Sequence, residues 1–377
     1  MKISTKYLDR LLGVPGMGTI LLLYIGSAVF LLVFAQLHGN SMMASDGGMY
    51  FKWSKTLFSG DNLFLLRAWV PLYPLVLWIT GVITFQSLNG PAVLFLTNLI
   101  FSVLSILVLQ KILNIIAPKY ARLGVAFFAF FPITGFDFSF IPRADKMAIF
   151  VLLVSILLYL REKWRLLPVL LAMGLLTQKA IWLSLIILCL FWLSRDPRAR
   201  FVCWLVPLPL IAYWIFGLSV GAESLVSLDR FSEINIQGSG GFLAGRGVVE
   251  GVTSESPAKV GKAIFVGAIG IFSLITSLLA LFRMSDRRFQ IALVVSLPLG
   301  IAAFLLNDHE LLAVARYAPP LAIAATIVLS TFSNIEKFRS DRGLWRHWLV
   351  LILMAAVANI SHLYFLLEVK LPLLGVN

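Results

Sequence analysis

The chain has 377 residues, of which 60% are hydrophobic and only 13% are charged, and its net charge is +13. A soluble protein needs about 25% charged residues to cover its surface, so this composition excludes an ordinary water-soluble domain. The two cysteines, Cys189 and Cys203, both lie in apolar segments, which excludes a disulfide framework and a cysteine-rich metal site.

Apolar stretches close to the ~20 residues that cross a bilayer recur along the whole chain. The first, 18–37, follows a basic N-terminal segment and is too long for the core of a cleaved signal, so we interpret it as a retained anchor. We expect an all-α, polytopic membrane protein, a single transmembrane domain over residues 1–377 with about eleven helices. The expected crossings are 18–37, 92–110, 123–134, 147–160, 167–177, 180–194, 201–218, 262–282, 289–306, 313–332 and 347–367.

Basic residues gather in the loops that this arrangement puts on one side, for example Lys111, Lys119 and Arg122. Cytoplasmic loops are enriched in Lys and Arg, so we place these loops and the N-terminus inside. The stretch 71–85 is then a re-entrant or interfacial segment on the outer side. One long helix over 167–194 is an alternative, and it would move every later loop to the opposite side of the membrane. The outer side receives the longer polar loops, which are 38–91, 135–146, 219–261 and 307–316.

We therefore expect the chemistry on the external, periplasmic face of a bacterial inner (plasma) membrane. The glycine-rich loop 219–261 is either a lid that orders over a ligand or a plain tether. The basic charge does not indicate a nucleic-acid partner, because it follows the membrane topology.

Asp46 follows the first crossing, in Ser45-Asp46-Gly47-Gly48-Met49-Tyr50. Ionisable groups near the apolar layer are costly and usually functional, and paired glycines let a backbone or ligand approach closely. Asp46 is therefore either a general base or a solvated loop carboxylate.

Charged residues also precede later apolar stretches. Arg143, Asp145 and Lys146 lie at the outer start of a crossing, where they either anchor the helix or hold a phosphate. Lys179 lies between two apolar stretches, and it is either a snorkelling lysine or an anion ligand.

The densest polar cluster of the second half contains Asn307, Asp308, His309 and Glu310, and Arg316 and Tyr317 follow it. No second histidine stands at helical spacing from His309, so no metal site is predicted. Arg316 has no acidic partner within one helical turn, which favours an anionic ligand such as a lipid phosphate.

Four motifs follow one another along the chain. They are Asp46-Gly47 with Tyr50, Trp69-Val70-Pro71-Leu72-Tyr73-Pro74, Asn98-Leu99 with Phe101, and Arg316-Tyr317 with Pro319 and Pro320. In these motifs and their order the chain resembles the GT-C glycosyltransferases, which take sugars from polyprenyl-phosphate donors. Within that superfamily it is most similar to bacterial relatives of GPI mannosyltransferase II, the PIG-V-like group.

Three positions depart from the pattern of that family. Ser45 stands where the family has Trp, Arg143-Ala144-Asp145 replaces Ser-Glu-Ser, and Thr177-Gln178-Lys179 replaces Thr-Arg-Pro. The basic residue of the last motif is thus a lysine, one place later. These departures leave the expected fold unchanged and the identities of donor and acceptor open.

The resemblance implies transfer of a hexose, such as mannose, from a polyprenyl-phosphate donor to a lipid, glycan or protein acceptor, with inversion. Asp46 would be the general base, and Lys179, His309 and Arg316 would counter the charge of the departing phosphate. No cofactor is assigned and the metal requirement stays open, with a divalent cation at Asp46, Asp145 and Glu310 as one alternative. The expected substrate-binding residues are Tyr50, Arg143, Asp145, Lys179, His309, Glu310, Arg316 and Tyr317.

Two other functions fit parts of the sequence. An O-antigen or exopolysaccharide polymerase would use loop arginines such as Arg230 and Arg246 in place of Asp46. A flippase of lipid-linked sugars usually shows internal repeats and broken helices near the bilayer midplane, and no such repeat is apparent.

Overall fold

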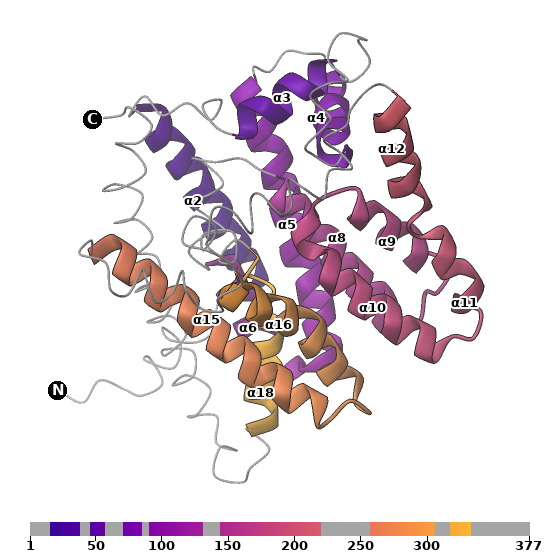
Figure 1. Cartoon of the computed structure of the whole chain (residues 1–377). Coiled ribbons are helices and arrows are strands. Elements are labelled where there is room, and N and C mark those ends of the chain that lie inside the picture. The colour runs from indigo at the N-terminus through magenta and orange to yellow at the C-terminus, as the bar shows by residue number, and fades with distance from the viewer. Residues whose placement is uncertain are drawn as a thin grey trace, which may run out of the picture.

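The computed structural model describes residues 16–37, 46–56, 71–84, 90–130, 144–219, 257–305 and 317–332. All regular elements in these ranges are helices, which confirms the all-α class (Figure 1). The α-helices are α2 (Met17–Leu37), α3 (Asp46–Thr56), α4 (Leu72–Ile83), α5 (Gly90–Ile116), α6 (Ala121–Ala129), α8 (Asp145–Leu160), α9 (Leu167–Leu175), α10 (Trp182–Arg195), α11 (Ala199–Val202), α12 (Leu208–Ser219), α15 (Pro257–Leu281), α16 (Arg287–Leu305) and α18 (Leu321–Phe332). Three short 3₁₀ helices are η2 (Pro118–Tyr120), η3 (Lys179–Ile181) and η4 (Cys203–Leu205).

The segment 38–91, which is expected to be external, contains two helices, α3 and α4. Two glycines at the start of α3 lower its intrinsic helix propensity. Its Tyr50 and Trp53 are nevertheless buried against Tyr73 and Leu77 of α4, so tertiary packing outweighs propensity. The stretch expected to be re-entrant or interfacial forms α4, a helix of 12 residues.

The ends of other expected loops are also helical. Asp145 and Lys146 begin α8, and residues 257–261 belong to α15. A helix start suits Asp145, because the positive end of the helix dipole favours a carboxylate.

The pair of expected crossings at 167–177 and 180–194 forms two helices, α9 and α10, which excludes one continuous helix there. The indole N–H of Trp182 donates to the Leu175 carbonyl at 3.1 Å and closes the corner between them. α9 has only nine residues, which span about 14 Å, whereas the hydrocarbon core is about 30 Å thick. α9 is therefore too short to cross a membrane by itself.

Two described segments, Gly90–Ile116 and Ala199–Phe216, are long and apolar enough to cross a membrane by length and composition. Four shorter apolar helices are Met17–Phe30, Leu72–Ile83, Val266–Leu281 and Leu321–Thr331. The total of about eleven crossings stays a prediction, and the last expected crossing, 347–367, lies outside the described residues.

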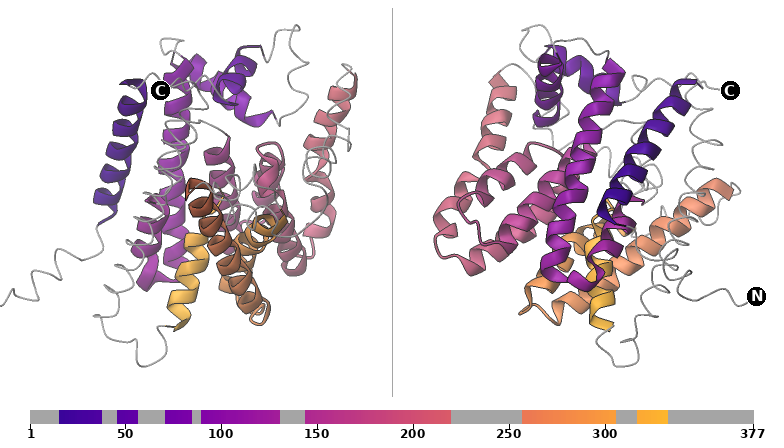
Figure 2. Two further views of the ribbon diagram at one scale, coloured as in Figure 1. Left: turned by 60° about the vertical axis from the view of Figure 1, so that its left-hand side comes forward. Right: turned by 180° about the vertical axis from the view of Figure 1, so that it is seen from behind.

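The buried side chains form two clusters. The larger one joins parts of α5, α6, α8, α10, α16 and α18, and a buried hydrogen bond of 2.7 Å from the Tyr159 hydroxyl to Gln290 Oε1 links α8 to α16. Both views of Figure 2 place α3 and α4 beside one end of α5, with α18 near its other end. The smaller cluster lies among α3, α4, the start of α5 and the start of α8, and contains Tyr50, Trp53, Tyr73, Leu77, Val93, Leu94, Ala144, Met147 and Val151.

Candidate functional site

A buried carboxylate at the start of α8 accepts a hydrogen bond from the segment that leads into α18. The Tyr317 hydroxyl donates to Asp145 Oδ1 at 2.7 Å. Asp145 is only 5% exposed, and a buried carboxylate is costly unless donors surround it. This bond therefore gives Tyr317 a definite role at the site.

The corner between α9 and α10 reaches the same carboxylate oxygen. The Gln178 Nε2 group lies 3.5 Å from Asp145 Oδ1, at the outer limit of a hydrogen bond. The Gln178 Oε1 atom in turn accepts the backbone N–H of Lys179 at 3.0 Å. Gln178 thus couples Asp145 to the start of η3.

Lys179 is exposed at this corner. Neighbouring atoms nevertheless displace enough water from its ammonium group to lower its pKa. A partly desolvated cation gains more from an anionic ligand than a fully hydrated one does. Lys179 therefore suits the role of an anion ligand.

Two tyrosines from α3 and α4 meet beside this group. The rings of Tyr50 and Tyr73 pack edge to face with centroids 5.0 Å apart. The Asn98 amide donates to the Tyr73 hydroxyl at 3.0 Å and to the Leu94 carbonyl at 3.0 Å. Asn98 Oδ1 is buried and has no hydrogen-bond partner in the described part of the chain.

The two groups are continuous. Tyr50 and Tyr73 lie in the same buried cluster as Ala144 and Met147, which flank the Asp145 carboxylate that Tyr317 bonds. The resulting network runs through Asn98, Tyr73, Tyr50, Tyr317, Asp145 and Gln178, which come from six separate segments of the chain.

The structure describes only part of the predicted site. It brings Tyr50, Asp145 and Tyr317 together and places Lys179 next to Gln178. Asp46 is the first residue of α3, one turn before Tyr50 on the same helical face, and only its backbone is described. The predicted residues Arg143, His309, Glu310 and Arg316 lie outside the described residues.

Three residues of the network were not predicted as site residues, namely Tyr73, Asn98 and Gln178. Each belongs to one of the sequence segments that were compared with the family, so the signal was available. What the sequence lacked was their bonding partners, because these bonds join residues that are distant in the chain.

Among the side chains that the structure describes, no group of three or more His, Cys, Asp or Glu could hold a metal ion. The alternative cation site at Asp46, Asp145 and Glu310 is not tested by this result, because Glu310 lies outside the described residues. Beside the Lys179 ammonium, the described polar groups of the site are one carboxylate, which accepts hydrogen bonds, and neutral hydroxyls and amides. Such a set suits hydrogen bonding with a polyhydroxylated ligand.

In comparisons with known proteins, neither a family model nor a curated protein matches the chain.

Proposed function

We propose that this protein is an integral membrane glycosyltransferase of the GT-C type, with about eleven crossings. It transfers a hexose from a polyprenyl-phosphate donor to a lipid, glycan or protein acceptor at the outer face of the membrane. One observation carries the proposal. Residues from all four motifs and from two of the departing segments meet in one polar network, from Asn98 to Gln178.

A polar network is costly in a chain this apolar. A buried polar group destabilises the folded protein unless it is hydrogen-bonded. Polar residues inside membrane proteins are usually functional. A network that only held helices together would need no orphaned acceptor, yet Asn98 Oδ1 is buried and unpaired among the described residues. A substrate hydroxyl bound at Asn98 would satisfy this acceptor.

The proposed reaction needs a base and an anion site. Asp46 accepts the proton of the acceptor hydroxyl, whose oxygen attacks the anomeric carbon from the face opposite the phosphate. The bond between the anomeric carbon and the phosphate oxygen breaks, and the polyprenyl phosphate leaves with the bonding electrons. The configuration at the anomeric carbon is inverted. A lipid phosphate is a good leaving group, so no general acid is needed.

The Asp145 carboxylate supports the anion site indirectly. Its Oδ1 atom is bonded by Tyr317 and approached by Gln178. Arg316 precedes Tyr317 and Lys179 follows Gln178 in the sequence, and consecutive Cα atoms are about 3.8 Å apart. We propose that Asp145 thereby gathers the two cations that hold the donor phosphate, with Arg143 and His309 assisting and Glu310 binding substrate.

The reaction is tested with purified protein in nanodiscs and a panel of radiolabelled polyprenyl-phosphate hexoses, together with a lipid extract of the host. Wild type should move label from one donor to a new product. Asp46→Asn should lower the rate at least about a hundredfold, the usual contribution of a general base. Asp196→Asn is the matched control, because Asp196 accepts the Arg198 backbone N–H before α11 and the amide oxygen of Asn can accept the same bond.

Asp46→Asn with undiminished transfer would remove Asp46 as the base. No transfer from any donor, with a lipid-linked oligosaccharide lengthened instead, would favour the polymerase.

A further inference from the structure

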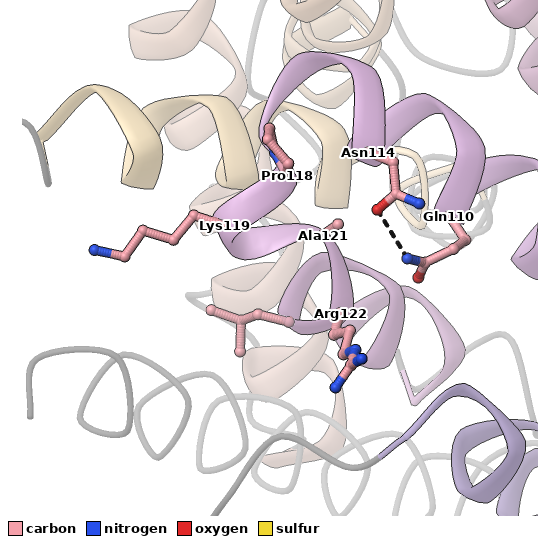
Figure 3. Close-up of a pocket in the computed structure, with 7 residues that line it drawn as sticks. Gln110, Asn114, Pro118, Lys119, Ala121 and Arg122 are labelled. Carbon is pink, nitrogen blue, oxygen red and sulfur yellow. Dashed lines mark hydrogen bonds between the residues drawn. The ribbon is translucent and has the colours of Figure 1, made fainter. Parts of the chain in front are cut away.

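A second polar site lies at the end of α5 that is distant from Asn98. A pocket of about 580 Å³ opens there, where α5 gives way to η2 and α6 (Figure 3). Its wall carries no acidic side chain among the described residues. The lining residues are Gln110, Asn114, Pro118, Lys119, Ala121, Arg122 and Leu123.

The pocket presents two cations, Lys119 and Arg122, and both side chains are exposed. Figure 3 shows Gln110 and Asn114 joined by a hydrogen bond on one wall, with Arg122 on the neighbouring helix and Lys119 reaching outward. An arginine fork and a lysine ammonium suit a phosphate group where, as in the described lining, no carboxylate stands beside them.

The pocket also offers an acceptor. Gln110 Nε2 donates to Asn114 Oδ1 at 3.0 Å, and this orientation leaves Gln110 Oε1 buried without a partner in the described ranges. A buried acceptor without a donor costs free energy. A ligand that carries a hydroxyl beside its phosphate would satisfy it.

An apolar surface runs along α5 towards the pocket. Ile100, Leu104, Leu107 and Ile115 are 44%, 37%, 39% and 46% exposed. Their spacing puts them on one face of the helix. A row of exposed apolar side chains that ends beside a cationic pocket matches an acyl chain followed by its headgroup.

We infer that this pocket binds the headgroup of an anionic glycerophospholipid that carries a hydroxyl beside its phosphate, with an acyl chain along the exposed face of α5. The phosphate contacts Arg122 and Lys119, and the headgroup hydroxyl donates to Gln110 Oε1. The loop concerned is basic and predicted to be cytoplasmic, and basic pockets at that surface bind anionic lipid headgroups. The inference rests on the membrane placement proposed above and not on sugar transfer.

The test is lipid binding to the purified full-length protein in detergent, followed by native mass spectrometry. Short-chain phosphatidylglycerol supplies phosphate and hydroxyl, phosphatidylethanol supplies a phosphodiester of the same charge without the hydroxyl, and phosphatidylcholine carries no net charge. Phosphatidylglycerol should bind most tightly. Arg122→Gln and Lys119→Gln should each weaken it about tenfold, the loss of one charge-assisted hydrogen bond.

Two variants sharpen the result. Lys163→Gln is the matched control, because Lys163 is exposed in the turn after α8 and does not line the pocket; its affinity should stay within about twofold of wild type, as for a remote exposed charge. Gln110→Met removes the acceptor at similar volume, and it should bring phosphatidylglycerol down to the affinity of phosphatidylethanol.

Three outcomes would overturn the inference. The first is equal binding of phosphatidylglycerol and phosphatidylcholine, and the second is an effect of Lys163→Gln as large as that of Arg122→Gln. The third is inorganic phosphate that binds as tightly as the lipid, which would make this a free-phosphate site. Binding is measured without a sugar donor, so failure here leaves the proposed transferase activity untouched. Failed sugar transfer with intact lipid binding would contradict the transferase proposal and leave the lipid site standing.

Discussion

Tyr317 and Asp145 are 172 positions apart in the chain, and a hydrogen bond of 2.7 Å joins them. Asp145 departs from the motif of the family that the sequence resembles, whereas Tyr317 belongs to a matching motif. A residue particular to this chain is therefore bonded to one that follows the family pattern. The bond fixes the start of α8 to the segment that leads into α18, which is where the sequence places Arg143 and Arg316.

Tyr317→Phe should destabilise the protein by about 1–3 kcal/mol, because it removes the closest described donor to a buried carboxylate. Thermal unfolding in detergent measures the effect. Tyr120→Phe is the control, since Tyr120 is buried and its hydroxyl bonds no other described residue. An equal loss in both variants would mean that the Asp145 bond contributes nothing specific.

A double-mutant cycle separates the bond from the packing. Asp145→Asn removes the charge and keeps an acceptor oxygen, so it should be milder than Asp145→Ala. The Asp145→Ala and Tyr317→Phe variants should couple by about 0.5–3 kcal/mol, as bonded neighbours do. Strict additivity would show that the two side chains do not interact in solution.

The Asn98–Tyr73 bond predicts an order of two substitutions. Tyr73→Phe leaves Asn98 donating to the Leu94 carbonyl and should cost about 0.5–1.5 kcal/mol, one ordinary hydrogen bond. Asn98→Ala leaves the buried Tyr73 hydroxyl without its donor and should cost more, because it also opens a cavity. Urea or thermal unfolding checks the order, and the reverse order would contradict the bonding pattern.

The sequence predicted those features that depend on local composition. Long apolar stretches predicted α2 to within one residue and the start of α5 to within two, although α5 continues six residues past the expected crossing. The polar corner at Gln178 predicted that α9 and α10 are separate. α3 was missed because its two glycines and polar residues are typical of a loop, while the burial of Tyr50 depends on a distant partner.

The site residues also fall into those with a local sequence signal and those that depend on a distant partner. Asp145 and Tyr317 stood out as polar residues beside apolar stretches, which is a local signal. The bond of Asn98 to Tyr73 spans 25 residues and that of Gln178 to Asp145 spans 33. A single sequence carries no record of such pairings, so these partners became visible only in the fold.

Substitution by alanine should change the stability of the protein in opposite directions at two glycines. A Cβ atom on Gly124 would meet Thr326 Oγ1, and Thr326 is buried with its hydroxyl bonded to the Ala322 carbonyl. This side chain is short and branched and has no room to yield, so Gly124→Ala should force α6 and α18 apart and lower the melting temperature.

Gly81 is the matched control, because nothing lies within 4 Å of a Cβ atom added there. Gly81→Ala should stabilise α4 by up to about 1 kcal/mol, the difference in helix propensity. Thermal unfolding of both variants checks the sign. Stabilisation by both would mean that α6 and α18 do not pack as closely as the structure has them.

The lowered pKa of Lys179 predicts its reactivity. A lower pKa raises the fraction of neutral amine at a given pH, and the neutral amine is the form that acylating reagents attack. Lys179 should therefore reach half of its maximal acetylation rate at a lower pH than a lysine in a short unstructured peptide. Lys55, which is exposed near the end of α3, serves as the bystander lysine on the same protein. Mass spectrometry of the modified peptides between pH 7 and pH 11 gives both profiles.

Polyprenyl phosphate should reverse this difference. An anion beside Lys179 favours the charged ammonium, raises its pKa and slows its acetylation, while Lys55 should stay unaffected. The same experiment with a neutral polyprenol controls for the lipid tail. If the phosphate slows neither lysine, Lys179 does not contact the donor, and the anion site proposed beside Asp145 must depend on other cations.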